Sequence, residues 1–167
     1  MNPSDTSQVG PDLRDVAGRF RIPGDFLGGA PYGAGHINHT FEVVVNQSGR
    51  LVRYIFQRVN ESVFRDIPAL MENIERVLAH LKEKARQIRP EIERSRRVLT
   101  LVPARDGATW ARDADGGAWR VYLFIEGAST YDVVRDASVA HEAACAFGRF
   151  QRLLADLPAP RLRETIP

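Results

Sequence analysis

The chain has 167 residues, of which 44% are hydrophobic and 26% charged, as expected for one globular domain with a hydrophobic core. Its net charge of +2 is too small to indicate a nucleic-acid or membrane partner, and no apolar run approaches the about 20 residues of a membrane span. A single Cys excludes an internal disulfide framework. Because the N-terminus lacks a basic segment followed by an apolar one, we expect a cytoplasmic protein.

The first half of the chain is expected to form a tail, a glycine turn and a hairpin. Residues 1–24 read as a tail with a short amphipathic helix, which Pro23 and Gly24 end. An extended segment, a glycine turn and a β-branched strand follow over residues 25–45. The short turn at residues 46–49 then predicts an antiparallel hairpin with a strand over residues 50–59.

The clearest helix is predicted over residues 66–82. Asp66 is suited to the N-cap, and Pro68 falls in the first turn, where its missing N–H costs nothing. Apolar side chains then recur at intervals of three and four, which is the pattern of a helix with one buried stripe. These are Ile67, Leu70, Met71, Ile74, Val77, Leu78 and Leu81. The pattern weakens after residue 82, and Pro90 ends any helix.

Two more strands are predicted over residues 98–102 and 119–125, with turn residues between them. A second long helix is capped by Asp136 or Ser138 and ended by Pro158. Its expected buried face consists of Val139, Ala143, Phe147, Phe150, Leu154 and Leu157. The fold class is therefore α+β, with five mostly antiparallel strands and one helix inserted after the third strand.

This order of elements is that of the N-terminal lobe of the protein-kinase-like fold. Over about residues 25–167 the chain resembles the aminoglycoside-phosphotransferase-like small-molecule kinases, and within them the N-acetylhexosamine 1-kinases. The stretches that carry the resemblance are GAGHINHT, YIFQRVN, VFRDIPALMENIERVLAHL, LVPARDG, WRVYLFIEGASTYD and AFGRFQRLLADLPAPRLRETIP.

The resemblance implies an arrangement and an activity. Residues 25–127 would be a kinase-like N-terminal lobe with a Gly-rich loop, and residues 128–167 the exit from the hinge and the first helix of the C-terminal lobe. Such enzymes transfer the γ-phosphoryl group of ATP, with Mg²⁺, to the anomeric hydroxyl of an N-acetylated hexosamine.

The glycine turn is the expected cover for the nucleotide phosphates. Gly33 and Gly35 have no Cβ, so backbone N–H groups can approach phosphate oxygens. Further donors would come from His36, Asn38 and Thr40. A structural hairpin bend is the alternative explanation of the same glycines. The group usually has an acidic residue where His39 stands, so this chain lacks that carboxylate.

The third strand should supply a cation to the α- and β-phosphates, as the strand lysine of a kinase does, but YIFQRV contains no Lys. Strand alternation places Ile55 and Gln57 on one face, and Phe56 and Arg58 on the other. Either the amide of Gln57 replaces the charge, or a bulge or shifted register brings Arg58 to the cleft. We prefer Arg58, because phosphate favours positive charge. Glu72 and Glu75 are the candidate helix partners of that cation, and Glu72 is preferred because it lies next to the apolar stripe. An ordinary surface residue is the alternative interpretation.

The hinge and sugar contacts follow from the resemblance alone. The stretch YLFIEGAS resembles the hinge between the two kinase lobes, so backbone groups at Phe124 and Glu126 would hydrogen-bond the adenine edge. Within RLRETIP, Arg163 and Glu164 are the candidates for approaching the sugar.

The catalytic loop of this superfamily, His-Gly-Asp followed by an Asn, does not occur in the chain. We therefore expect the front part of a longer kinase, with no catalytic residue and no metal ligand of its own, inactive by itself. The Mg²⁺ ligands would lie in the C-terminal lobe. The alternative is a non-catalytic nucleotide-binding or interaction module derived from such a kinase. A nucleic-acid binder, suggested by the charged residues 82–97, lacks aromatic residues for base stacking.

Overall fold

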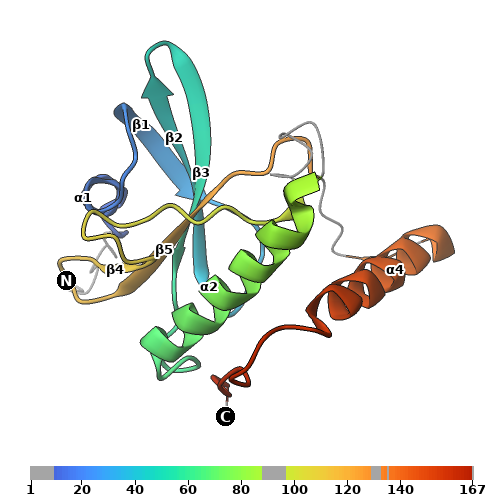
Figure 1. The fold of residues 1–167 in the computed structure, drawn as a ribbon. Helices are drawn as coiled ribbons and strands as arrows, with labels where there is room; N and C mark the ends of the chain where they lie inside the picture. The colour runs from blue at the N-terminus through green and yellow to red at the C-terminus, as the bar shows by residue number, and fades with distance from the viewer. Residues whose placement is uncertain (1–9, 88–96, 129–132, 135, 167) are drawn as a thin grey trace, which may run out of the picture.

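The computed structural model describes residues 10–87, 97–128, 133–134 and 136–166, which form an α+β fold (Figure 1). The helices are α1 (Leu13–Arg19), α2 (Ile67–Lys84), the short 3-10 helix η1 (Ala85–Gln87) and α4 (Ala137–Leu154). The strands are β1 (Asp25–Pro31), β2 (His39–Gln47), β3 (Arg50–Arg58), β4 (Ala111–Arg112) and β5 (Ala118–Leu123). None of the helices in these ranges combines the length and apolar character needed to cross a membrane.

The strands form one antiparallel sheet in the order β1-β2-β3-β5-β4, which confirms the predicted five-stranded sheet. β2 and β3 are joined by Ser48 and Gly49, which both have positive φ, at 53° and 89°. Two such residues make the tight turn that matches the twist of paired strands. Asn46 supports it, since its Oδ1 accepts the Gly49 N–H at 2.7 Å. The turn thus sets the register of the hairpin.

The predicted strand over residues 98–102 is not one of the five. This segment runs beside β5 and makes only a bridge, in which Val102 N donates to Val121 O and Leu123 N donates to Thr100 O, both at 2.9 Å. Pro103 follows and has no N–H with which to continue a ladder. The remaining length of that edge of β5 is paired with β4 instead.

The sheet has two different faces. The face that we call the core face carries Val43, Val45, Tyr54, Phe56 and Val121, all buried. It is covered by Val16 and Ala17 of α1 and by Phe20, which caps the end of that helix. The opposite face, which we call the α2 face, meets α2 where Ala118 of β5 packs against Ile67, Leu70 and Met71. In Figure 1, α2 accordingly runs along the sheet on the side away from α1. Any ligand site on the α2 face is therefore bordered by that helix.

Both predicted helix starts are confirmed. Asp66 caps α2 by accepting the Ala69 N–H at 2.9 Å, and a proline stands in the first turn. Asp136 caps α4 by accepting the Ser138 N–H at 2.7 Å, so it is the cap rather than Ser138. These contacts satisfy N–H groups that a helix leaves without an internal partner.

The predicted buried face of α4 is wrong. No residue of α4 is buried, and Phe147 and Phe150 are 70% and 43% exposed. The helix lies beside α2 and not on the sheet (Figure 1), and its contribution to the core is Leu154, which packs on Leu78 and Leu81. An amphipathic pattern predicts which face is apolar, but a neighbour is needed to bury that face.

The two helices should therefore respond differently to truncated side chains. Met71→Ala should lower the free energy of unfolding by about 2–5 kcal/mol, because the side chain is 1% exposed and its loss leaves a cavity beside β5. Phe147→Ala should change it by less than about 0.5 kcal/mol, because that ring lies in solvent. Urea unfolding followed by circular dichroism measures both. Equal losses would contradict the exposed position of α4.

Candidate functional site

The glycine turn joins β1 to β2 and is open to solvent. Tyr32 N donates to Thr40 O at 2.9 Å and closes the base of the turn. Gly33 has a φ of +76°, a conformation that other residues rarely adopt, and a Cβ at Gly33 or Gly35 would meet no atom within 4 Å. Packing therefore does not explain these glycines. Their peptide groups are accessible to a ligand, as the phosphate interpretation requires.

Other predicted donors of this turn have different positions. His36 is exposed at the tip of the turn. Asn38 is engaged in the fold, because its Oδ1 accepts the Asn60 N–H at 2.9 Å and ties the turn to the end of β3. His39 lies in β2 opposite Arg58. Thr40 is the next residue of β2, and its side chain belongs to a row of polar groups on the α2 face.

That polar row crosses three neighbouring strands. Thr40 of β2 is paired with Gln57 of β3, which is paired with Arg120 of β5. Gln57 Nε2 donates to Thr40 Oγ1 at 3.1 Å. Gln57 Oε1 accepts from Arg120 Nε and Nη2 at 2.9 and 2.6 Å. The amide therefore holds the guanidinium from one side and is itself held by the hydroxyl.

Arg120 was not among the residues predicted from the sequence. Its Nη1 is buried and has no hydrogen-bond partner, and burial lowers the pKa of the guanidinium, with Tyr122 opposing that shift. The group stays charged, since arginine does not deprotonate in proteins. An alternation argument on WRVYL would have placed Arg120 and Tyr122 on one face. Only the pairing of β3 with β5 puts it opposite Gln57.

Arg58 lies on the other side of the sheet. β2 and β3 pair without a register shift, so the bulge that would turn Arg58 toward the α2 face is not there. Its guanidinium lies over the backbone of Gly117, where a Cβ would come within 2.4 Å of Nε, and its Nη2 is 3.9 Å from Asp113 Oδ2. Of the two alternatives considered for the strand, Gln57 is the residue on the α2 face.

Asp113 organises the turn that Arg58 contacts. Its side chain is 7% exposed, and it accepts the Gly117 N–H and the Trp119 Nε1–H, both at 2.7 Å. Burial by itself raises the pKa of Asp113, but the hydrogen bonds and the charge of Arg58 together outweigh it, so the pKa lies below its usual value. The carboxylate therefore stabilises the fold in its ionised form.

Glu72 does not contact a strand cation. It forms an ion pair with Arg163 at 2.9 Å, between Glu72 Oε2 and Arg163 Nη2. The neighbouring Asn73 amide binds the backbone of the same residue twice, since Nδ2 donates to Arg163 O at 2.8 Å and Oδ1 accepts Arg163 N–H at 3.0 Å. The sugar candidate Arg163 is thus fastened to α2, and Glu164 beside it is exposed.

The hinge candidates lie at the other end of β3. Phe124 N donates to Arg53 O at 3.1 Å, so this N–H is used within the sheet. The Phe124 ring contacts two other side chains: the Arg53 guanidinium lies 3.9 Å from its centroid, and the centroid of the Tyr32 ring lies 5.6 Å from it. Glu126 pairs with Arg53, which also binds Glu42 at 3.2 Å. The two carboxylates raise the pKa of Arg53, with the hydrogen bond to Glu126 contributing most.

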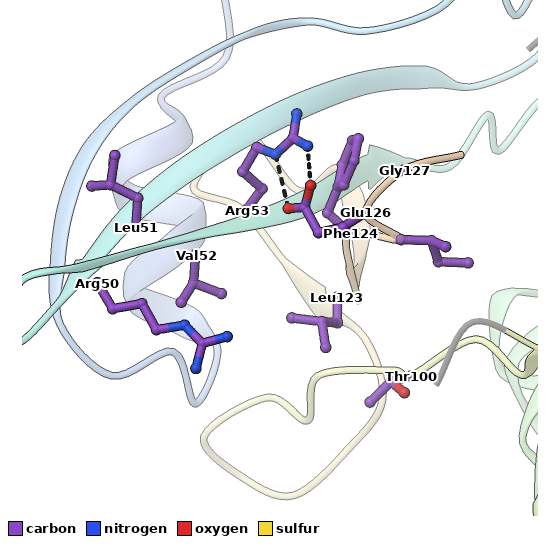
Figure 2. Close-up of a pocket in the computed structure, with 10 residues that line it drawn as sticks. Arg50, Leu51, Val52, Arg53, Thr100, Leu123, Phe124, Glu126 and Gly127 are labelled. Carbon is purple, nitrogen blue, oxygen red and sulfur yellow. Dashed lines mark hydrogen bonds and ion pairs between the residues drawn. The ribbon is translucent and has the colours of Figure 1, made fainter. Parts of the chain in front are cut away.

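A hollow of about 420 Å³ borders the same segment (Figure 2). It is lined by residues 50–53 of β3, Thr100, and residues 123–127. Figure 2 shows the Arg53–Glu126 pair on one side of the strand, with Val52 and Leu123 on the other. Arg53 and Gln57 are four residues apart on β3, or about 13 Å. The hollow is therefore separate from the polar row.

Within the described ranges, no group of three or more His, Cys, Asp or Glu side chains is arranged to hold a metal ion. No protein-family model matches the chain. The held guanidinium on the α2 face and the accessible peptide groups of the glycine turn between β1 and β2 both suit an anionic ligand.

The contribution of Asp113 to stability should depend on pH. Its folded pKa lies below the unfolded value of about 3.9, so its contribution is present above that pH and is lost as the pH falls through the folded pKa. Asp113→Asn should therefore cost about 1–3 kcal/mol at pH 7, and the difference from the wild type should shrink below pH of about 4. Urea unfolding at a series of pH values measures this. A constant difference would contradict the ionised role.

Proposed function

We propose that this chain is the ATP-binding part of an ATP-dependent sugar kinase that phosphorylates an N-acetylhexosamine at its anomeric hydroxyl. The observation that carries the proposal is the open glycine turn at one end of a polar row that holds a guanidinium on the α2 face. Accessible peptide N–H groups and a fixed cation are the two features that bind a phosphate chain in proteins.

The order of elements supports the same proposal. A hairpin with a glycine turn, a third strand, a helix on one face and a strand leading to residues 124–127 follow one another as the resemblance requires. Because the Phe124 N–H is bound to Arg53 O, adenine would be met by the backbone around Glu126. This backbone role does not depend on the Glu126 side chain, which is occupied by Arg53.

Phosphoryl transfer would take place in a longer polypeptide. The reaction depends mainly on positioning the reactants and on stabilising the charge of the transition state. In kinases, the residues that do this come from two lobes. The catalytic Asp belongs to the His-Gly-Asp loop, which does not occur in these 167 residues, and the Asp that holds Mg²⁺ follows that loop. Arg163 and Glu164 would approach the sugar from this part of the polypeptide, and Arg163 is held in place by Glu72 and Asn73.

Nucleotide binding is the first test. ATP should shift the amide NMR signals of residues 33–40 and 124–127 of the 167-residue chain, with weak affinity because one wall of the site and the metal ligands belong elsewhere. Changing Gly33 and Gly35 together to Val should abolish the shifts, because the side chains block the approach of phosphate to the backbone. Gly148→Val, on exposed α4, is the matched control and should have no effect. Shifts confined to residues 82–97 would refute the assignment.

Catalysis should require the longer polypeptide. The 167-residue chain with ATP, Mg²⁺ and N-acetylhexosamines should give no measurable sugar 1-phosphate, since losing even one transition-state contact costs about 10²–10³ in rate. Activity should appear when a C-terminal lobe carrying the His-Gly-Asp loop is joined to it. Product formation is measured by coupled ADP release and by ³¹P NMR. Turnover by the purified 167-residue chain would contradict this division of the site.

A further inference from the structure

Arg120 carries a hydrogen-bond donor that the described residues leave without an acceptor. Its Nε and Nη2 both donate to Gln57 Oε1, whereas Nη1 is buried and has no partner. A buried charged donor without an acceptor is costly, and such a group in a native protein is commonly met by a water or an ion. Because the group is a cation, an anion with several oxygens would satisfy it best.

The same sheet neutralises its other half-buried arginines. Arg53 contacts Glu42 at 3.2 Å and Arg58 lies 3.9 Å from Asp113. For Arg120, no carboxylate of the part of the chain that the structure describes lies within ion-pair distance. A Glu in place of Gln57 would have cancelled the charge, whereas the amide holds the guanidinium and leaves its charge intact.

The position of Arg120 relative to the glycine turn indicates which kind of anion would bind to its guanidinium. Thr40, at the far end of the row, also accepts the Tyr32 N–H that closes the turn. Two strand spacings, or about 10 Å, separate Thr40 from Arg120. A chain of phosphate groups reaching from the turn along this row would thus meet both the peptide N–H groups and the guanidinium.

We propose that Arg120, positioned by Gln57, is the cation that receives the phosphate groups of the nucleotide, in place of the lysine that β3 lacks. The identification of the ligand as a nucleotide rests on the proposed function. Gln57 acts as a positioning residue, since it contacts Arg120 and sets the direction of the guanidinium. Arg58, on the core face, has no part in the site.

The experiment follows the Nε–Hε NMR signal of Arg120 while ATP, inorganic triphosphate or adenosine is added to the 167-residue chain. We expect ATP and triphosphate to shift this signal and adenosine not to shift it. Arg120→Met should weaken the binding of ATP and triphosphate about tenfold to hundredfold, as read from the amide signals of residues 33–40, because a charge-assisted hydrogen bond is lost. The affinity for adenosine should not change.

Gln57→Glu tests the same site without removing Arg120. The substitution keeps the size of the side chain and gives the guanidinium a carboxylate partner, so the fold is retained while the binding of both phosphate compounds falls. Arg120→Lys should retain part of the affinity, because it keeps the charge but not the planar donor fork. Arg86→Met is the matched control: Arg86 is exposed at η1, and its loss should leave all three ligands unaffected.

The possible results separate this inference from the proposed function. ATP binding that survives both Arg120→Met and Gln57→Glu, or that is lost in Arg58→Met, overturns the role of Arg120 and leaves the nucleotide proposal standing. Binding of triphosphate that depends on Arg120, with no preference for ATP, upholds the phosphate site and overturns the nucleotide proposal. If neither phosphate compound shifts the Arg120 signal, the role of Arg120 is overturned. If ATP also leaves the amide signals of residues 33–40 unchanged, the nucleotide proposal is overturned as well.

Discussion

The alternation of side chains along β3 determines both faces of the sheet. Tyr54 and Phe56 are buried on the core face beneath α1, and this leaves Gln57 on the α2 face. A slip of one residue in this strand would move the aromatic rings out of the core and Gln57 into it. The turn at Ser48 and Gly49, where both residues have positive φ, opposes such a slip. The hydrophobic core and the polar row therefore depend on the same register.

The α2 face has different electrostatic character at its two ends. Near residues 124–127, Arg53 pairs with both Glu42 and Glu126, so its positive charge is neutralised within the protein. Near the glycine turn, the guanidinium of Arg120 is held by an amide and remains uncompensated among the described residues. The end near residues 124–127 therefore suits a neutral group of a ligand, and the end near Arg120 suits an anionic group.

α2 connects the sheet to the C-terminal segment. Its inner side packs on Ala118 through Met71. Polar side chains on its outer side bind the last turn of α4 and the segment after it. Asn73 binds both backbone groups of Arg163, Arg76 donates to the carbonyls of Pro158 and Pro160, and His80 contacts the carbonyl of Leu153. These contacts are made to backbone groups, and the ion pair of Lys84 with Asp156 adds a side-chain contact. Glu72, paired with Arg163, takes part in this connection and not in the polar row.

The sequence by itself determined the features whose causes lie within a few residues: the cap Asp66, the hairpin turn, and the opposite facing of Gln57 and Phe56. It placed the cap of α4 at Asp136 or Ser138, and the structure decided for Asp136. It predicted the open glycine turn but not the residue opposite Gln57. The tertiary structure alone decided that Arg120 faces Gln57, that residues 98–102 form a bridge beside β5, and that the apolar face of α4 is exposed. Each of these depends on whether segments far apart in the chain pair or pack together. The pattern of residues within one segment does not determine that.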